Sequence, residues 1–263
     1  MVQTSVIGCG NMGSALVKGL RRAGNHTVTA CDLDPEALDA VADYADRTTS
    51  DIAEAADADV VIVAVKPDIV GVVLNDLELS PDQTLLSIAA GVPTDFVEAR
   101  TDANVVRIMP NLAAETGDMA AAVTGDDVTD DVRALLGDVG EFVEIDETKM
   151  DIATAVNGSG PAFVFYLLQA MKESGVDSGL DPEAAETLAA QTFKGAAETV
   201  LRSDRTVDEL IDAVCSPNGT TIEGMEVLWD SDVQTSVAEA VTAAEERSAE
   251  LASEFNDGDE TDE

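Results

Sequence analysis

The sequence predicts an α/β protein in which an N-terminal, doubly wound parallel sheet is followed by an all-α domain. In the first part of the chain, short apolar runs alternate with helical patterns, as in parallel sheets whose strands are joined by helices. From Lys149 onward, long helical periodicities replace the β-branched runs. A length of 263 residues fits one large domain or two modest ones. We therefore expect a sheet domain at residues 1–147, a helical domain at 148–255 and a disordered acidic tail at 256–263.

The predicted strands are short and apolar. The run Val60–Val65 is apolar throughout, which is typical of a parallel strand buried on both faces. A first helix is predicted over Ser14–Ala23, and Asp34 begins a second with an acidic first turn. His26 lies in a polar stretch between two of the runs, where we expect a surface loop. The strands are expected at Val2–Ile7, Thr27–Cys31, Val60–Val65, Leu85–Ala89, Val105–Met109, Ala120–Val123 and Glu141–Val143.

One predicted helix of the second domain, Ala162–Met171, is apolar on nearly all sides. A helix without a polar face must be covered on every side, and a small helical domain has too little material to do this. We therefore expect a partner subunit to cover it. The other helices are expected at Pro182–Val200, Val207–Val214 and Asp232–Phe255.

The charge of the chain excludes several classes of partner and site. Fourteen Lys and Arg stand against 53 Asp and Glu, a net charge of −39, which excludes nucleic acid as a partner. Because carboxylates are spread along the chain, and about 1 M salt shortens the Debye length to roughly 3 Å, this composition favours a halophilic protein. Three distant cysteines and one histidine predict neither disulfides nor a metal site. Without a signal peptide or membrane span, we expect a cytoplasmic protein.

A glycine motif directly follows the first predicted strand. Gly8, Gly10 and Gly13 have the spacing of a Rossmann-type dinucleotide-binding turn, and a helical pattern follows. Asp32 comes 32 − 8 = 24 residues later, where a carboxylate hydrogen-bonds the adenosine ribose. A carboxylate there accepts a bond from a free 2′-hydroxyl and repels a 2′-phosphate. The residues therefore predict NADH or NADPH as cofactor and favour NADH.

Further motifs follow the other predicted strands. Lys66 ends the third, and Ser87–Val92 ends the fourth with small residues. Both ends face the ligand crevice of a parallel sheet. Asn111 follows the fifth strand, where its amide could orient a ligand carbonyl. In the second domain, Ser216–Thr221 enters a helix whose amides and hydroxyls suit a small carboxylate, although the same pattern describes an ordinary capped helix.

In order and spacing, these motifs resemble the pyrroline-5-carboxylate reductase family over essentially the whole chain except the tail. The resemblance implies reduction of 1-pyrroline-5-carboxylate to L-proline, the final step of proline synthesis. It also implies a homodimer through intertwined helical domains, often assembled further, with the active site between the two domains. The motifs are the glycine turn, Ala64-Val65-Lys66-Pro67, Ser87–Val92, Met109-Pro110-Asn111, Gly158-Ser159-Gly160-Pro161-Ala162 and Ser216–Ile222.

The resemblance also assigns residues. It places Asp204, Ser216, Gly219, Thr220 and Thr221 at the substrate. Many members have Ser, Thr or Arg at the position of Asp32, and paired glycines where this chain has Asn218-Gly219; because Asn tolerates positive φ, we expect the loop to survive. The nucleotide positions are Ile7, Gly8, Cys9, Gly10, Asn11, Met12, Asp32, Asp51, Ala64, Val65, Lys66, Pro67, Ile88, Ala90 and Asn111.

A protonated cyclic imine is already electrophilic, so hydride transfer needs placement of the reactants, which can supply roughly 7–11 kcal/mol. We expect amides near Gly219 and Thr220 to bind the substrate carboxylate and the Thr221 hydroxyl, as the catalytic group, to bond the ring nitrogen. Two other functions remain open: a related imine reductase or hydroxyacid-type dehydrogenase, and a non-catalytic nucleotide-sensing subunit. The former would use a positioned Lys, His or Asn, and the latter would have a damaged substrate loop.

Overall fold

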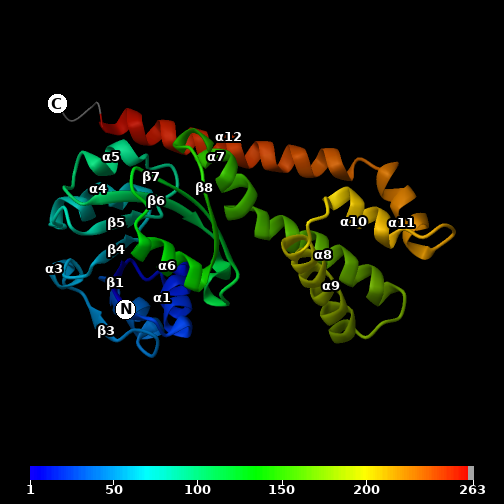
Figure 1. The fold of residues 1–263 in the computed structure, drawn as a ribbon, viewed down its shortest axis with the longest axis horizontal. Coiled ribbons are helices and arrows are strands. Elements are labelled where there is room, and N and C mark those ends of the chain that lie inside the picture. The colour runs from blue at the N-terminus through cyan, green and yellow to red at the C-terminus, as the bar shows by residue number, and fades with distance from the viewer. Residues whose placement is uncertain (260–263) are drawn as a thin grey trace. The chain divides into compact units, whose positions relative to one another are not determined.

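The computed structural model describes residues 1–259, with side chains up to residue 253 (Figure 1). The chain forms two compact units. Unit 1 contains Met1–Ser159 and the segment that begins at Thr242, and unit 2 contains Gly160–Val241. The expected boundary at residues 147/148 therefore lies within unit 1, and the last helix belongs to both units. No described helix combines the length and the apolar character that a membrane crossing requires.

Unit 1 is built on one eight-stranded sheet of order β3-β2-β1-β4-β5-β6-β7-β8. All neighbours pair in parallel except β6 and β7, which are antiparallel, so the sheet is mixed and mostly parallel. The link at 111–118 is too short for the crossover that a parallel pair needs. The strands are β1 (Val2–Ile7), β2 (His26–Cys31), β3 (Arg47–Thr49), β4 (Val60–Val63), β5 (Thr84–Ser87), β6 (Asn104–Pro110), β7 (Met119–Gly125) and β8 (Gly140–Glu144).

The helices of unit 1 cover both faces of this sheet (Figure 1). The side chains of β4 alternate between the two faces, and both faces are buried: Val60 and Ile62 pack into one core cluster, and Val61 and Val63 into the other. This confirms a strand buried on both faces. The helices are α1 (Asn11–Ala23), α2 (Pro35–Val41), α3 (Ile52–Ala55), α4 (Pro67–Asp76), α5 (Thr94–Glu98), α6 (Asp130–Val139) and α7 (Met150–Ala153), with short turns η1 (Leu112–Glu115), η2 (Glu147–Lys149) and the π-helical η3 (Thr154–Gly158).

The prediction of a surface loop at His26 is wrong. His26 is the first residue of β2 and is only 8% exposed, and its Nε2 lies 2.9 Å from Asp138 Oδ2 at the end of α6. The neighbours Asn25 and Thr27 are polar, so the local sequence gives no sign that His26 is buried. Its burial comes from a helix more than a hundred residues later in the chain.

Unit 2 consists of helices. It contains α8 (Gly160–Asp177), α9 (Pro182–Arg202), α10 (Val207–Val214), α11 (Thr220–Trp229) and the first part of α12 (Val233–Asp259). Of its residues, all of which the structure describes, only Ala185 and Ala189 are buried, whereas Phe165 and Tyr166 are 66% and 78% exposed. The single chain therefore leaves the apolar helix largely uncovered. The tail expected from residue 256 begins inside α12, and residues 260–263 lie outside the described residues.

Candidate active-site residues

The glycine turn after β1 is fixed by close packing at two of its glycines. Gly8 has a left-handed backbone (φ +97°), donates to the Cys31 carbonyl at 2.8 Å, and would place a Cβ 2.7 Å from the Ala64 oxygen. A Cβ on Gly13 would lie 1.9 Å from the Gly8 oxygen. Side chains are therefore excluded at both positions by the backbone of neighbouring elements.

Gly10 has a different environment. A Cβ added there would meet nothing within 4 Å. Gly10 is the N-cap of α1 and has no side chain to cap the helix amides, and the next residue, Asn11, is exposed. An open approach to uncapped amides at a helix N-terminus is what a pyrophosphate requires. The turn therefore fits the pyrophosphate of a dinucleotide, and the expected contacts of Ile7 to Met12 with its phosphates stay a prediction.

Asp32 lies directly beside this turn. Its Oδ2 accepts from the Cys9 amide at 2.6 Å and its Oδ1 from the Asp34 amide at 2.9 Å. Asp51 begins α3, where its Oδ1 accepts from Ala53 N at 3.0 Å. The structure thus places both predicted ribose carboxylates at the carboxyl ends of β2 and β3.

The pKa values of two buried thiols in this region are raised by burial and by nearby carboxylates. Burial first, and then the negative charges of Asp32, Asp51 and Glu54, raises the pKa of Cys31 to about 11. Burial and then Asp32 raises the pKa of Cys9 to about 12. Both thiols are therefore neutral near pH 7 and unsuited to nucleophilic chemistry. Cys9 contributes its backbone to the turn.

The remaining predicted nucleotide residues follow the next two strands along the same edge. Ala64 N donates to the Ile7 oxygen at 2.8 Å, and Ile88 N donates to the Val63 oxygen at 3.2 Å. Lys66 is exposed at the N-cap of α4, which begins at Pro67. Val65 and Ala90 are half-buried in the two loops. The structure therefore brings these residues together with the glycine turn.

The side-chain amide of Asn111 forms hydrogen bonds with other residues of the chain. Its Oδ1 accepts from Ala113 N at 3.2 Å and Ala120 N at 3.3 Å, and its Nδ2 donates to the Asn157 oxygen at 3.3 Å. Asn157 in turn donates to the carbonyls of Met109 and Ala120. These contacts fix η3 against the ends of β6 and β7. Nδ2 has two N–H donors and uses one of them here, so the expected bond from the Asn111 amide to a ligand carbonyl stays a prediction.

The predicted substrate loop lies in unit 2. Gly219 N donates to the Ser216 oxygen at 2.9 Å, and Asn218 has φ +57°, so residues 216–219 form a turn with a left-handed third residue. The expectation that Asn would tolerate this conformation is confirmed. A Cβ on Gly219 would lie 2.4 Å from Ser216 Oγ, so a larger residue there would displace the Ser216 hydroxyl.

This turn presents the start of α11 without a cap. Gly219 is the N-cap, and no side chain accepts from the first amides of the helix. Thr220 and Thr221 are exposed. Asp204 is also exposed, in the link between α9 and α10. Free amides, a partial positive charge and two hydroxyls are groups that suit a small carboxylate.

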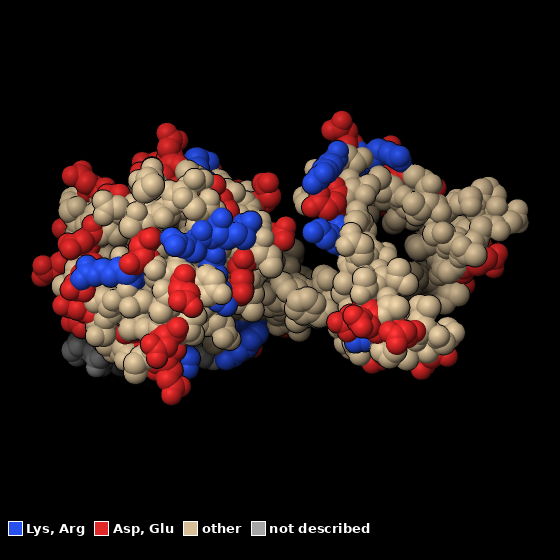
Figure 2. Space-filling view, turned by 90° about the horizontal axis from the view of Figure 1, so that it is seen from below, with Lys and Arg blue, Asp and Glu red and all other residues tan. Residues whose placement is uncertain are grey.

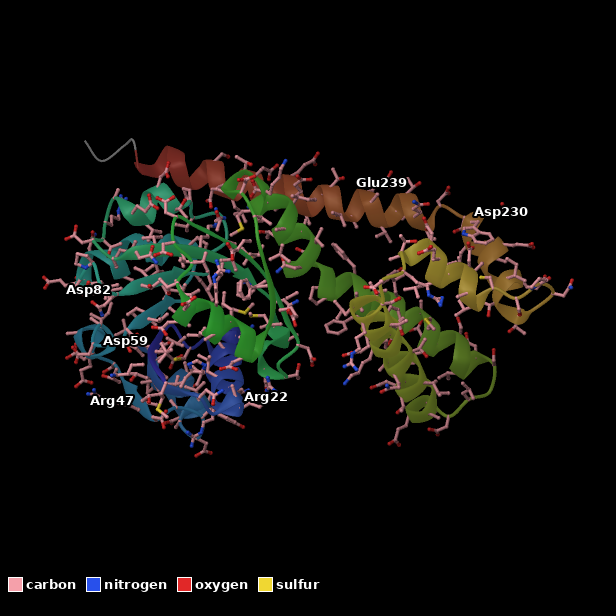
Figure 3. All side chains as sticks on the ribbon, viewed as in Figure 1. Arg22, Arg47, Asp59, Asp82, Asp230 and Glu239 are labelled. Atoms are coloured by element: carbon pink, nitrogen blue, oxygen red, sulfur yellow. The ribbon has the colours of Figure 1, made fainter. Side chains whose placement is uncertain are left out.

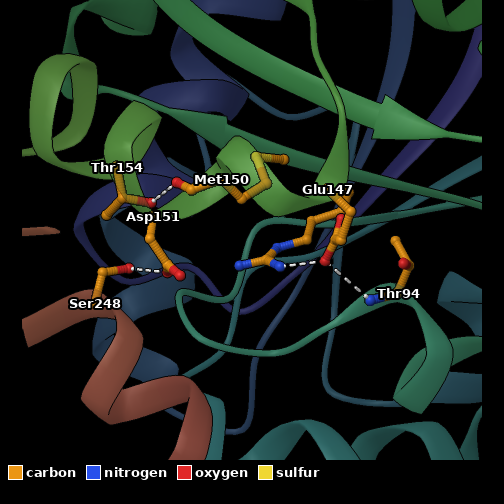
Figure 4. Close-up of polar contacts among 7 residues, drawn as sticks. Thr94, Glu147, Met150, Asp151, Thr154 and Ser248 are labelled. Carbon is orange, nitrogen blue, oxygen red and sulfur yellow. Dashed lines mark hydrogen bonds and ion pairs between the residues drawn. The ribbon is translucent and has the colours of Figure 1, made fainter. Parts of the chain in front are cut away.

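A polar cluster that was not predicted from the sequence fixes the segment leading out of the sheet (Figure 4). Arg107 on β6 is 5% exposed and pairs with Glu147, whose carboxylate also accepts from Thr94 N at 3.4 Å. Next to it, Ser248 on α12 donates to Asp151 Oδ1 at 2.7 Å. An arginine inside an otherwise apolar strand was the available signal, since such a charge needs a partner.

Comparison with known proteins adds to this geometry. Residues 147–251 match the family model for pyrroline-5-carboxylate reductase dimerisation, and residues 3–91 match the model for coenzyme F420-dependent NADP oxidoreductases. The chain is 39% identical to the pyrroline-5-carboxylate reductase of Methanosarcina acetivorans, with 93% of this chain and 96% of the relative covered. The chain belongs to the pyrroline-5-carboxylate reductase family. It is accordingly an NAD(P)H-dependent pyrroline-5-carboxylate reductase of the final step of proline biosynthesis.

Solved structures of the family agree. The Coxiella burnetii pyrroline-5-carboxylate reductase matches with a TM-score of 0.85 at 30% identity, covering 95% of this chain and 98% of the other. The Plasmodium falciparum enzyme, determined with NADP bound, matches with a TM-score of 0.83 at 30% identity over the same shares. A reductive aminase from Aspergillus terreus, at 15% identity and a TM-score of 0.57, shows a common fold alone. Pyrroline-5-carboxylate reductase is thus supported over the rival dehydrogenases.

Proposed function

We propose that this reductase holds the substrate carboxylate at the start of α11 and chooses NADH through Asp32. One observation carries the substrate assignment: the α11 N-terminus is uncapped by any side chain and follows a turn that glycine and a left-handed Asn shape. A helix start left in this form has amide donors available for an anion. A nucleotide-sensing subunit would have no need of them.

In this proposal each residue of the loop has one task. The amides near Gly219 and Thr220 bind the carboxylate, Ser216 shapes the turn, and the Thr221 hydroxyl hydrogen-bonds the ring nitrogen. Asp204 stands on the substrate side. When bound, the reduced nicotinamide supplies the hydride for the C=N carbon. The protein needs no strong acid, since placement alone can supply roughly 7–11 kcal/mol.

Thr221→Ala tests the catalytic assignment. We expect kcat/KM for the imine to fall about 10- to 100-fold, because one hydrogen bond at the reacting nitrogen is lost, while affinity for the nucleotide is unchanged. Thr235→Ala, an exposed threonine near the start of α12, is the matched control. Wild-type kcat/KM in Thr221→Ala would show that its hydroxyl does not contact the ring.

The nucleotide proposal follows from the place of Asp32 beside the glycine turn. A ribose hydroxyl would donate to its carboxylate, whereas a 2′-phosphate would meet a like charge. Ala64–Pro67, Ile88 and Ala90 would then border the other ribose and the nicotinamide, and Asp51 the adenosine ribose. High salt weakens the repulsion, so we expect a preference for NADH and not exclusion of NADPH.

Asp32→Ser should shift the ratio of kcat/KM values towards NADPH by about tenfold, most visibly at the lowest salt the fold tolerates. Asp39→Ser, an exposed carboxylate on α2, is the control. A wild-type enzyme that strongly prefers NADPH, with a ratio that Asp32→Ser leaves unchanged, would place the Asp32 carboxylate away from the ribose.

We further propose that the active form is a cytoplasmic homodimer through unit 2, which can assemble further. The exposed Phe165 and Tyr166 on α8 support this, as does the matched dimerisation model. An apolar helix face of this kind is stable only when it is covered. Sedimentation should therefore show no folded monomer at micromolar concentration, and Phe165→Glu should lose both assembly and activity. An active monomer would contradict the proposal.

A further inference from the structure

Thr49, at the end of β3, joins three carboxylate-bearing residues around the adenosine end of the nucleotide site. Its backbone oxygen accepts from Asp32 N at 3.2 Å, and its hydroxyl accepts from Asp51 N at 3.0 Å. The same hydroxyl donates to Glu54 Oε2 at 2.5 Å. Thr49 is buried, so this arrangement is held in place. Glu54 is thereby fixed beside the two predicted ribose residues, although no family motif assigns it a role.

Glu54 also forms an ion pair with a cationic side chain of the same strand–helix segment. Arg47 is the only Lys or Arg between residues 23 and 65, and its guanidinium lies 2.5 Å from Glu54 Oε2. Arg47 and Thr49 are two residues apart on one strand and so have their side chains on the same face of the sheet. Figure 3 shows Arg47 at the β3 edge of unit 1. Both members of the pair are about half exposed, so Arg47 is free to turn towards a ligand once its partner is lost.

We propose that Glu54 is a specificity-determining residue for the nucleotide: it holds Arg47 in an ion pair, so that an adenosine 2′-phosphate meets carboxylates and no available counter-charge. Arg is the side chain best suited to a phosphate, because its fork of donors can bind two phosphate oxygens. Glu54 therefore completes the selection that Asp32 begins. This inference rests on the proposed function, since it places the adenosine ribose beside Asp32.

The test measures dissociation constants of NAD⁺ and NADP⁺ by calorimetry, in the assembled enzyme, at the lowest salt the fold tolerates and at about 2 M KCl. Glu54→Gln keeps an oxygen acceptor for Thr49 and removes the charge that holds Arg47. It is made in the wild-type chain and in Asp32→Ser. Glu141→Gln, an exposed carboxylate on β8 at the opposite edge of the sheet, is the matched control. Arg47→Gln is added to Glu54→Gln to remove the released cation.

We expect Glu54→Gln to tighten NADP⁺ binding about fivefold at low salt in both backgrounds, with NAD⁺ affinity unchanged and a smaller gain at high salt. Arg47→Gln should abolish the gain. A gain equal to that of Glu141→Gln, or one that persists without Arg47, would overturn the inference. If Asp32→Ser alone leaves the NADP⁺-to-NAD⁺ ratio unchanged while Glu54→Gln shifts it, the proposed role of Asp32 fails and that of Glu54 stands.

Discussion

Two glycines of the turn after β1 differ in what an added methyl group would meet. At Gly13 a Cβ would lie 1.9 Å from the Gly8 oxygen, whereas at Gly10 it would meet nothing within 4 Å. The protein fold therefore explains glycine at position 13 but not at position 10. A glycine at position 10 is instead expected from the proposed binding of a nucleotide, whose pyrophosphate would approach the backbone closely.

This difference makes a paired prediction. Gly13→Ala should lower the free energy of unfolding by about 3 kcal/mol, because backbone must move to admit the methyl group. Gly10→Ala should melt like the wild type and weaken nucleotide binding about tenfold or more. Thermal melting and nucleotide titration of both variants measure this. Unchanged nucleotide affinity in Gly10→Ala would mean that the pyrophosphate does not approach this residue.

Asn218 allows a second test at one residue. Its φ of +57° is strained for a β-branched side chain, at about 1–2 kcal/mol or more, and is easy for glycine. Asn218→Val should therefore raise KM for the imine several-fold without changing nucleotide affinity, and Asn218→Gly should behave as the wild type. Equal kinetics in the two variants would indicate that the turn does not shape the substrate site.

The sequence allows prediction of single residues when a local pattern defines their geometry. The roles of Gly8 and Gly13 follow from the spacing of one motif. The positive φ of Asn218 was expected from the family resemblance, because members of the family have paired glycines at positions 218 and 219. The contacts of His26 with Asp138 and of Asn111 with Asn157 could not be predicted, because each pairs residues far apart in the chain. Neither has a local signal.

At the scale of elements, apolar runs predicted seven of the eight strands. β3 was missed because its three residues, Arg47, Thr48 and Thr49, are polar and the strand lies at the sheet edge. The direction of β7 was also missed, since an alanine-rich run is compatible with either orientation. The short link between β6 and β7 indicates the antiparallel direction, because a parallel pair needs a longer crossover connection.

The pair of Arg107 and Glu147 gives an element-scale prediction. Glu147→Ala leaves the guanidinium on β6 nearly buried and without its carboxylate, so unit 1 should lose about 2–3 kcal/mol. Glu115→Ala removes the partner of Lys18 in an exposed pair and should cost about 0.5 kcal/mol. Urea unfolding of both variants measures the difference. Equal losses would show that η2 is not anchored by this pair.

At the scale of the whole molecule, the main feature is the large negative net charge. Figure 2 shows carboxylates spread over the visible surface of both units, with several Lys and Arg side chains between them. The net charge of −39 makes the folded chain repel itself, and salt screens that repulsion. The halophilic adaptation expected from composition remains a prediction, because fold and family are independent of it.

Thermal melting in KCl tests it. Between about 0.1 M and about 3 M KCl, the midpoint should rise by about 10 °C or more, because the Debye length falls below the spacing of surface charges. A series in sucrose, which stabilises compact states without screening, is the control. If the midpoint is the same at both salt concentrations, or if sucrose reproduces the whole increase, the halophilic interpretation is wrong.

The most direct test of the account is a rate measurement on the assembled wild-type protein at high salt, with 1-pyrroline-5-carboxylate and either reduced nucleotide. We predict that nucleotide is oxidised only when the imine is present, that one proline forms for each nucleotide consumed, and that kcat/KM is higher with NADH than with NADPH. If neither nucleotide is oxidised in response to the imine by the folded dimer, the glycine turn and the α11 site do not form the proposed reductase.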